Sequence, residues 1–321
     1  MPISAYPANI IIFIHYLCAM DKFYGEICQF LHDYGLHIYK VGEGYGHISV
    51  KAECSGNDRT IPLLLLEIRA NSQEEAERQY AEASAEIARL ADESGTYPLI
   101  LTEDRWSSQG EMTRSRLLAH LEIFTQIYAR NCEVRRIDKA TALNFLQTSH
   151  SYGDAACKYR YGLYLKRHTG HNALRLSESN DNPDGQAIAA LQPGTLIAVA
   201  TFSNARKWIK GDKTIRSYEW TRYASLPGVR LSGGMGKVLK TFIKEVQPDD
   251  IMTYADLEWS EGKVYEQLGF TLEGVKEPVT FLIGSDCRRR PDRPDIPAME
   301  EDRWLRNFGS NKYRLKLTDY Q

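Results

Sequence analysis

Residues 231–246, LSGGMGKVLKTFIKEV, place three glycines directly before a helix-forming run. Glycines in such a turn let backbone N–H groups approach a ligand closely, and the N-terminus of a helix favours an anionic phosphate. Gly233, Gly234, Gly236 and the adjacent Lys237 are therefore candidate phosphate-binding residues. The order of the glycines differs from a dinucleotide fingerprint, and the turn lacks the spacing and the Ser or Thr of a Walker loop.

The stretches on either side of this turn predict strands. SYEWTRYAS (217–225) precedes the turn, and IMTYADL (251–257) follows the helix. YADLEWSEGKVYEQLGF (254–270) then places Asp256 at the end of the second strand and Tyr265 in a short helix before Gly269-Phe270. One interpretation is that Tyr265 packs the helix onto the sheet and Asp256 only ends the strand. The other is that both residues belong to an acyl-transfer site.

The first half of the chain predicts a smaller α/β unit. SQEEAERQYAEASAEIARLADESG (72–95) has a capping box in Ser72 and Glu75, and Gly95 supplies a C-terminal stop. Two apolar runs flank this helix, TIPLLLLEIRA (60–70) and TYPLILTEDRW (96–106). A strand, a crossover helix and a second strand are expected. We predict an α/β (α+β) protein with a domain boundary between 1–126 and 127–321.

Composition indicates a globular protein with an uneven charge. The 321 residues carry a net charge of −2, but residues 1–126 hold 10 basic and 18 acidic residues, and the remainder holds 30 and 24. The second half could therefore face a polyanion, although an acidic surface helix in the first half would explain the asymmetry equally well. The apolar stretch IIIFIHYLCAM (10–20) is too short to span a bilayer. Six scattered cysteines favour reduced thiols, so a cytoplasmic location without a membrane partner is expected.

The order of strand, glycine turn, helix, strand and helix with Y-x-x-x-G-F resembles the GNAT acyltransferase superfamily. Gly234-Met235-Gly236 matches the second half of the turn with which that family binds the pyrophosphate of coenzyme A, whereas Leu231 replaces the usual Gln or Arg. The resemblance implies acetyl-CoA or a related thioester as donor and a GNAT-like mixed sheet flanked by helices. It also implies that Tyr265 donates a proton to the departing thiolate.

A narrower resemblance extends over residues 127–285. Five motifs occur in the order seen in phage and mobile-element proteins related to Mom-type DNA-modification proteins, namely FLQTSHSYG (145–153), YGLYL (161–165), LIAVATFSNARK (196–207), YEWTRYASLPGVRLSGGMGKVL (218–239) and YADLEWSEGKVYEQLGF (254–270). This resemblance implies modification of the exocyclic amine of adenine in DNA. The positions that match its motifs are His150, Arg222, Ser225, Asp256 and Tyr265.

Each matched residue also has a purely structural interpretation. Arg222 could contact a phosphate or pair with a nearby glutamate, and Ser225 could belong to the turn that follows it. His150 and Asp256 could accept the proton of the amine or simply satisfy local hydrogen bonds. The resemblance further suggests iron, with His150, Asp256 and Tyr265 as possible ligands, but the residues themselves do not require a metal.

The upstream half resembles a degenerate endonuclease of the very-short-patch-repair type, which has a restriction-endonuclease-like fold. The alignment with NDRTIPLLLLEIRA (57–70) implies Asp58 and Glu67 as metal-binding acids and Arg69 in the lysine position. Arginine cannot exchange a proton at neutral pH, so an inactive scaffold is the preferred hypothesis. For the whole chain we expect acyl transfer from a CoA thioester to an amine. The alternatives are a small-molecule or peptide N-acetyltransferase and a non-catalytic nucleic-acid-binding protein of a mobile element.

Overall fold

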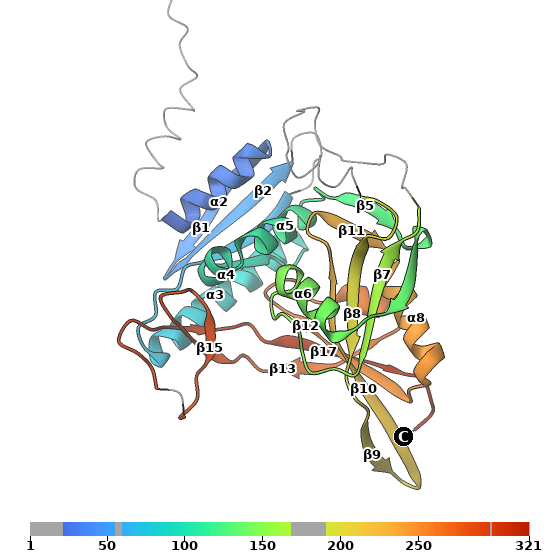
Figure 1. The fold of residues 1–321 in the computed structure, drawn as a ribbon. Helices are drawn as coiled ribbons and strands as arrows, with labels where there is room; N and C mark the ends of the chain where they lie inside the picture. The colour runs from blue at the N-terminus through green and yellow to red at the C-terminus, as the bar shows by residue number, and fades with distance from the viewer. Residues whose placement is uncertain (1–21, 55–59, 168–190, 296, 321) are drawn as a thin grey trace, which may run out of the picture. The chain divides into compact units, whose positions relative to one another are not determined.

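The computed structural model describes residues 22–54, 60–167, 191–295 and 297–320 (Figure 1). The chain divides into two compact units. Unit 1 comprises Met1–Ser107 and Thr280–Asn307, and unit 2 comprises Ser108–Val279 and Phe308–Gln321. The mixed α/β fold expected from the sequence is confirmed. The apolar stretch at 10–20 lies outside the described residues, and no helix within them is long and apolar enough to cross a membrane.

Unit 1 is built on a four-stranded sheet in the order β1-β2-β3-β4. Its elements are α2 (Lys22–Asp33), β1 (Leu36–Gly44), β2 (His47–Cys54), β3 (Thr60–Leu66), α3 (Gln73–Ser94), β4 (Leu99–Thr102) and α4 (Glu103–Ser108), which ends at the division. β3 and β4 are parallel and α3 connects them, so the predicted crossover is confirmed. The Ser72 side chain accepts the Glu75 N–H at 3.2 Å, and Gly95 ends α3 in the left-handed region.

The segment that returns to unit 1 carries the basic, proline-containing stretch near residue 290. It forms β14 (Thr280–Ile283), β15 (Arg289–Pro291) and β16 (Arg303–Arg306), which pair in the order β15-β14-β16. Arg289 forms an ion pair with the buried carboxylate of Asp104 at 2.6 Å, and Arg290 forms one with the buried carboxylate of Asp302. These arginines are therefore neutralised within unit 1.

Unit 2 is built on a larger sheet in the order β13-β17-β12-β10-β8-β7-β6, with β9 paired to β10. Its elements are α5 (Gly110–His120), β5 (Thr125–Tyr128), the 3-10 helix η1 (Ala129–Asn131), β6 (Cys132–Arg136), α6 (Lys139–Ser149), β7 (Tyr159–Leu165), β8 (Leu196–Phe202), β9 (Arg206–Lys210), β10 (Lys213–Ser225), β11 (Val229–Ser232), α8 (Gly234–Val246), β12 (Asp250–Asp256), α9 (Lys263–Gln267), β13 (Thr271–Lys276) and β17 (Ser310–Lys316). β10 and β12 run parallel, and the other neighbouring pairs in this sheet are antiparallel.

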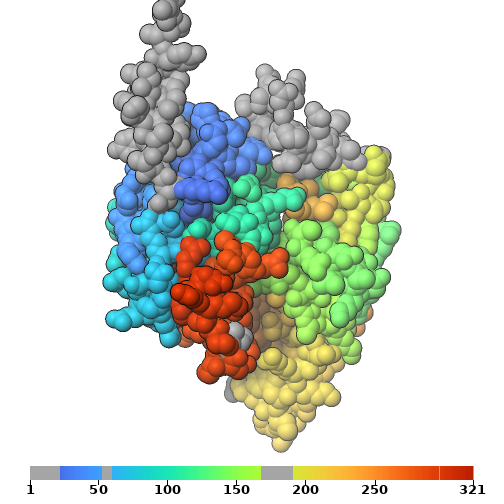
Figure 2. All heavy atoms as spheres, turned by 60° about the vertical axis from the view of Figure 1, so that its left-hand side comes forward, coloured from blue at the N-terminus to red at the C-terminus, as the bar shows by residue number. Residues whose placement is uncertain are grey.

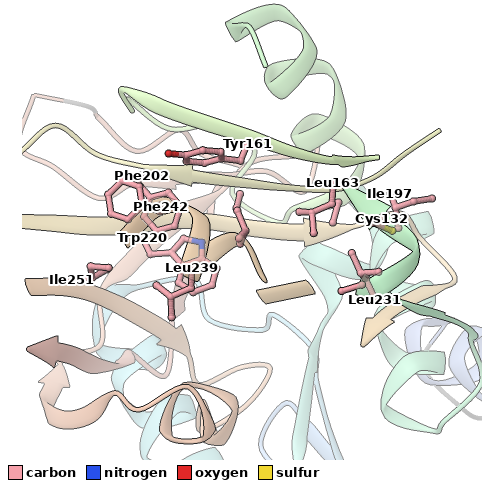
Figure 3. Packing of buried hydrophobic residues seen from close by; sticks show 14 of the residues in the cluster. Cys132, Tyr161, Leu163, Ile197, Phe202, Trp220, Leu231, Leu239, Phe242 and Ile251 are labelled. Carbon is pink, nitrogen blue, oxygen red and sulfur yellow. The ribbon is translucent and has the colours of Figure 1, made fainter. Parts of the chain in front are cut away.

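The two faces of this sheet are buried by different helices. Phe242 of α8 stacks on Phe202 of β8 with ring centroids 3.9 Å apart, inside a large apolar cluster (Figure 3). The neighbouring Val199 points to the other face, where it packs with Ala142 and Leu146 of α6. This alternation is the period-two pattern of a strand that is buried on both sides.

The division into units lies earlier in the chain than the predicted boundary at 126/127. β5 pairs in parallel with β11, from Thr125↔Val229 to Tyr128↔Ser232. The Ser115 hydroxyl, in α5, also accepts the Gly228 N–H at 2.6 Å. These long-range hydrogen bonds place α5 and β5 in unit 2, although the sequence around them resembles the end of the upstream half.

A candidate active site where two parallel strands stop pairing

The parallel pair β10 and β12 is short. Its register covers only three residues on each strand, ending at Glu219↔Met252. On its other side β10 has an irregularity between Trp220 and Arg222, where it pairs with β8. Beyond this point backbone groups of the two strands do not pair with each other, and a side chain bridges them instead, because Thr253 Oγ1 donates to Trp220 O at 3.1 Å. Unpaired backbone groups between two strands can bind an extended ligand.

A buried charge network fixes the closed end of this strand pair. Asp250 is fully buried, and its Oδ1 accepts hydrogen bonds from Ser217 Oγ at 2.5 Å and from Arg314 at 2.6 Å. Its other carboxylate oxygen accepts the Tyr320 hydroxyl. Because Ser217 and Asp250 face each other in the register, these contacts hold β10 and β12 together just before they separate.

Tyr265 reaches the point of separation from α9. Gly262 begins this helix with φ 87, and a side chain there would overlap Ala255 and Tyr313 at 2.6 and 2.8 Å. The Tyr265 ring packs against Trp220 at 6.2 Å and against Tyr313 at 5.5 Å. Burial raises the pKa of its hydroxyl, opposed by a hydrogen bond with Thr253. The hydroxyl is therefore protonated at neutral pH, which is the form that can donate a proton.

The glycine turn leads into α8 as predicted. Gly233 caps the helix with φ 78 in the left-handed region, and the first helical hydrogen bond runs from Lys237 N to Gly233 O at 3.0 Å. The N–H groups of the first turn have no partner within the helix, which is the geometry that binds anions. A side chain at Gly234 would overlap the Tyr223 hydroxyl and would lie 2.7 Å from Leu231. Gly234 is therefore required for packing.

Lys237 and Tyr223 differ in their hydrogen bonding. Lys237 Nζ donates to the carbonyl oxygens of Ala129 and Cys132 at 2.8 and 2.5 Å, so its charge is directed to the start of β6. The Tyr223 hydroxyl is buried, has no hydrogen-bond partner among the described residues, and has its pKa raised by burial. Lys237 is therefore not placed to bind an anion at the start of α8, whereas the Tyr223 hydroxyl lies beside Gly234.

His150 and Asp256 meet through Tyr152, a residue that the sequence analysis did not single out. The Tyr152 hydroxyl donates to Asp256 Oδ2 at 3.0 Å, and the Tyr152 backbone N–H donates to His150 Nδ1 at 3.1 Å. Asp256 Oδ1 accepts the Glu258 N–H at 3.0 Å. Because His150 Nδ1 is an acceptor, the neutral imidazole carries its proton on Nε2, which makes His150 a donor rather than a base in this arrangement.

Arg222 and Ser225 make backbone contacts. Arg222 Nε donates to Gly153 O at 2.9 Å, and its guanidinium lies 5.9 Å from the centre of the Tyr152 ring. Burial lowers the pKa of Arg222. Ser225 Oγ donates to Val229 O at 2.8 Å and closes the turn between them. In the structure Arg222 therefore positions the loop that carries Tyr152, while Ser225 shapes the entry to the glycine turn.

The three possible iron ligands have protein partners in the structure. The His150 Nδ1 and both oxygens of Asp256 already accept hydrogen bonds, and the Tyr265 hydroxyl forms one with Thr253. Over residues 22–54, 60–167, 191–295 and 297–320, no group of three or more His, Cys, Asp or Glu residues could hold a metal ion. The suggestion of iron stays a prediction, and the mechanism below does not use it.

The nuclease-like residues of unit 1 are only partly described. Asp58 lies outside the described residues. Glu67 and Arg69 directly follow β3 and form an ion pair with each other, on side chains that are 26% and 45% exposed. An acid that pairs with the residue in the lysine position is not arranged to bind Mg²⁺ on its own. The hypothesis of a degenerate nuclease stays a prediction.

Comparisons with known proteins give weak similarities. No protein-family model and no curated protein matches the sequence. A solved structure from Corynebacterium glutamicum, described as histone acetyltransferase HPA2 and related acetyltransferase, is 10% identical over 59% of this chain and 98% of its own, with a TM-score of 0.32. A GNAT-family acetyltransferase from Bacillus anthracis is 16% identical over 49% of this chain and 65% of its own, with a TM-score of 0.24. TM-scores this low do not establish a shared fold or activity.

Proposed function

We propose that unit 2 is an acyltransferase that moves a small acyl group from a CoA thioester to an amine. The observation that carries the proposal is the separation of β10 and β12 directly beside the glycine turn of α8, with the partly buried Tyr265 at the point of separation. An extended thioester arm between the two strands would bring its sulfur towards Tyr265, and its pyrophosphate would meet the first turn of α8.

The chemistry follows from the positions of the proton-transferring groups. The amine attacks the thioester carbonyl, a C–N bond forms and the C–S bond breaks. Tyr265 is protonated at neutral pH, as a phenol ordinarily is, and it donates this proton to the leaving thiolate. Tyr152 accepts the proton of the amine as it passes its own hydroxyl proton to Asp256. One proton leaves the amine and one reaches the sulfur, so the transfer is balanced.

His150 and Arg222 support this arrangement. His150 holds the Tyr152 backbone through its Nδ1, and its Nε2–H is a donor suited to the developing oxyanion or to the acceptor. Arg222 fixes the adjacent Gly153 carbonyl at 2.9 Å. We assign both as positioning residues, because each forms a hydrogen bond with the loop that carries Tyr152.

The acceptor that we favour is the exocyclic amine of adenine in DNA. Support comes from the ordered motifs that resemble Mom-type DNA-modification proteins and from the excess of basic residues after residue 126. A small-molecule or peptide amine is the rival acceptor. Mass spectrometry of nucleosides from cells that express the protein distinguishes the two. Modified adenine in the wild type and its loss in Tyr265→Phe are expected, whereas unmodified adenine in both would remove the DNA acceptor.

The transfer reaction itself is tested by release of free thiol from acetyl-CoA with duplex DNA, a polyamine and a lysine peptide as separate acceptors. Tyr265→Phe should release thiol more slowly by a factor of about 10²–10⁴, the usual contribution of one acid–base group. Thiol release that is independent of every acceptor and unchanged in Tyr265→Phe would contradict the proposed function and favour a non-catalytic nucleic-acid-binding protein.

A further inference from the structure

The ribbon formed by β9 and the first residues of β10 carries an excess of positive charge. Figure 1 shows it extending beyond the rest of the large sheet, and the yellow lobe at the lower edge of Figure 2 is the same region. β9 pairs with no strand other than β10 among the described residues. Five cations lie within 206–216, against the single acid Asp212; they are Arg206, Lys207, Lys210, Lys213 and Arg216.

The register places like charges directly opposite each other. Lys213 faces Lys210, and Arg216 faces Lys207. Like charges at directly opposed positions destabilise an antiparallel pair, by an amount comparable to the roughly 0.2–1 kcal/mol that favourable pairs contribute. Arg216 is partly compensated by Asp249 at 3.6 Å, and Lys213 Nζ donates to Asp319 O at 3.1 Å. An anionic partner bound to the ribbon would relieve this repulsion.

Most of the ribbon's charge faces solvent. Arg206, Lys207 and Lys210 are exposed, and none of them forms an ion pair within the described part of the chain. Ile209 lies among them and is 78% exposed, more than any other exposed large hydrophobic side chain described. A surface on which cationic side chains surround an apolar one is suited to a polyanion that has less polar surface between its charged groups.

Aromatic rings lie beside these cations. Trp208 packs edge-on against Tyr320 at 5.5 Å, and Lys210 Nζ lies 5.7 and 5.9 Å from the two ring centres. Lys316 Nζ lies 5.1 Å from the Tyr320 ring. Tyr320 is buried and Trp208 is partly exposed, so these rings support the ribbon while the neighbouring lysines remain available to phosphates.

We propose that the β9–β10 ribbon docks a DNA duplex, with Lys207, Lys210 and Lys213 on the phosphates. The major groove of B-DNA, about 12 Å wide, admits a two-stranded ribbon, whereas the deep, narrow major groove of A-form RNA does not. The proposal rests on the proposed function for its choice of acceptor, and it gives that acceptor a docking surface outside the site of acyl transfer.

A different use of the same lysines is protection of an edge strand. Lysines on an edge strand prevent it from pairing with another chain. Protection of this kind applies to the lysines on β9 and also to Lys213, because β10 pairs only with β9 at that position. It leaves unexplained why Lys213 and Lys210 face each other across the ribbon. The two uses predict different behaviour when the lysines are removed.

The test is fluorescence anisotropy of the full chain with a short fluorescein-labelled DNA duplex, over a series of KCl concentrations. The variant is Lys207→Gln/Lys210→Gln/Lys213→Gln. The matched control is Lys139→Gln/Lys240→Gln/Lys244→Gln, three exposed lysines on α6 and α8 with the same change in charge. Because the assay contains no acyl donor, its outcome is independent of whether acyl transfer occurs.

The ribbon variant should weaken binding by at least about ten-fold. It should also lower the slope of log K against log salt by about 2–3, since each phosphate contact contributes about 0.9. The control should change neither quantity appreciably. The proposal is overturned if the ribbon variant binds DNA like the wild type. If that variant also self-associates in sedimentation velocity, the lysines protect an edge strand instead. It is equally overturned if the control weakens binding as much, or if A-form RNA or phosphatidylserine vesicles bind the ribbon as tightly as DNA.

Discussion

The Tyr152 hydroxyl donates to Asp256 Oδ2 at 3.0 Å across 104 positions of the chain. This hydrogen bond joins the loop after α6 to the end of β12, and Tyr152 is 42% exposed. A tyrosine that is partly exposed and is backed by a carboxylate can take a proton from a bound amine and pass its own inward. In the proposed mechanism Asp256 therefore accepts the proton of the amine through Tyr152.

Tyr152→Phe should separate chemistry from donor binding. It removes only the hydroxyl, so the dissociation constant for acetyl-CoA should stay unchanged while kcat for acyl transfer falls by about 10²–10⁴. Tyr164→Phe, which removes a hydroxyl from β7, is the matched control and should keep full activity. Equal kcat values for Tyr152→Phe and the wild type would remove Tyr152 from the proton path and leave Asp256 to accept the proton directly.

Two glycines of the turn should differ sharply when replaced by alanine. Gly234→Ala would overlap Tyr223 and Leu231, and overpacking of this kind lowers the free energy of unfolding by about 1–3 kcal/mol. Gly236 has only Leu268 near its Cβ position, at 3.4 Å, so Gly236→Ala should be neutral or stabilise the helix by up to about 1 kcal/mol. Urea unfolding measures both. Equal losses in the two variants would contradict the packing role assigned to Gly234.

The Asp250 network should be costly to break from one side. Arg314→Met leaves the fully buried Asp250 carboxylate without its cation, and loss of one partner of a buried pair costs about 3–5 kcal/mol. The double variant Arg314→Met/Asp250→Asn should recover part of this loss, because no uncompensated charge remains. Urea unfolding in which the double variant is no more stable than Arg314→Met would show that the charge pair is not the source of the effect.

Glu273 gives unit 2 a defined acid sensitivity. Hydrogen bonding to Arg314 is the largest cause that lowers its pKa from 4.5 to about 2. A carboxylate whose pKa is depressed on folding stabilises the protein above its unfolded pKa, and this stability is lost as the pH falls through the folded pKa. Stability of the wild type should therefore decline between pH 4.5 and about 2. Glu273→Gln should be less stable at pH 7 and should show a smaller decline over the same window, as measured by urea unfolding at each pH.

Local patterns predicted much of the fold. The capping residue Ser72, the stop at Gly95 and the strands on both sides of α3 are formed as expected, because these features depend on residues close in sequence. The strand, glycine turn, helix and strand around α8 are likewise formed. Pairings between strands that are far apart in the chain, such as that of β5 with β11, could not be predicted. No local pattern specifies which strand an edge strand pairs with.

The candidate site was predicted only in part. Tyr265 and Asp256 were chosen from a motif, and the structure places Tyr265 where the strands separate. Tyr152 was missed because its importance comes from a contact with Asp256 that depends on the tertiary fold. Its signal in the sequence is the segment His150-Ser151-Tyr152-Gly153, in which the family motif specifies only the histidine and the glycine. Lys237, chosen for its charge beside the turn, donates instead to the backbone near β6.

The central claim is that a CoA thioester binds between β10 and β12 with its phosphates at the start of α8. Calorimetric titration of acetyl-CoA into the wild type and into Gly236→Glu tests it most directly. The variant places a carboxylate where the phosphates would lie, at a position whose Cβ meets only Leu268. Lys240→Gln, on the exposed side of α8, gives the same change in charge as a control. Saturable binding is expected in the wild type and the control, with at least about a ten-fold loss in Gly236→Glu. No binding heat in the wild type, or equal affinity in all three proteins, would contradict it.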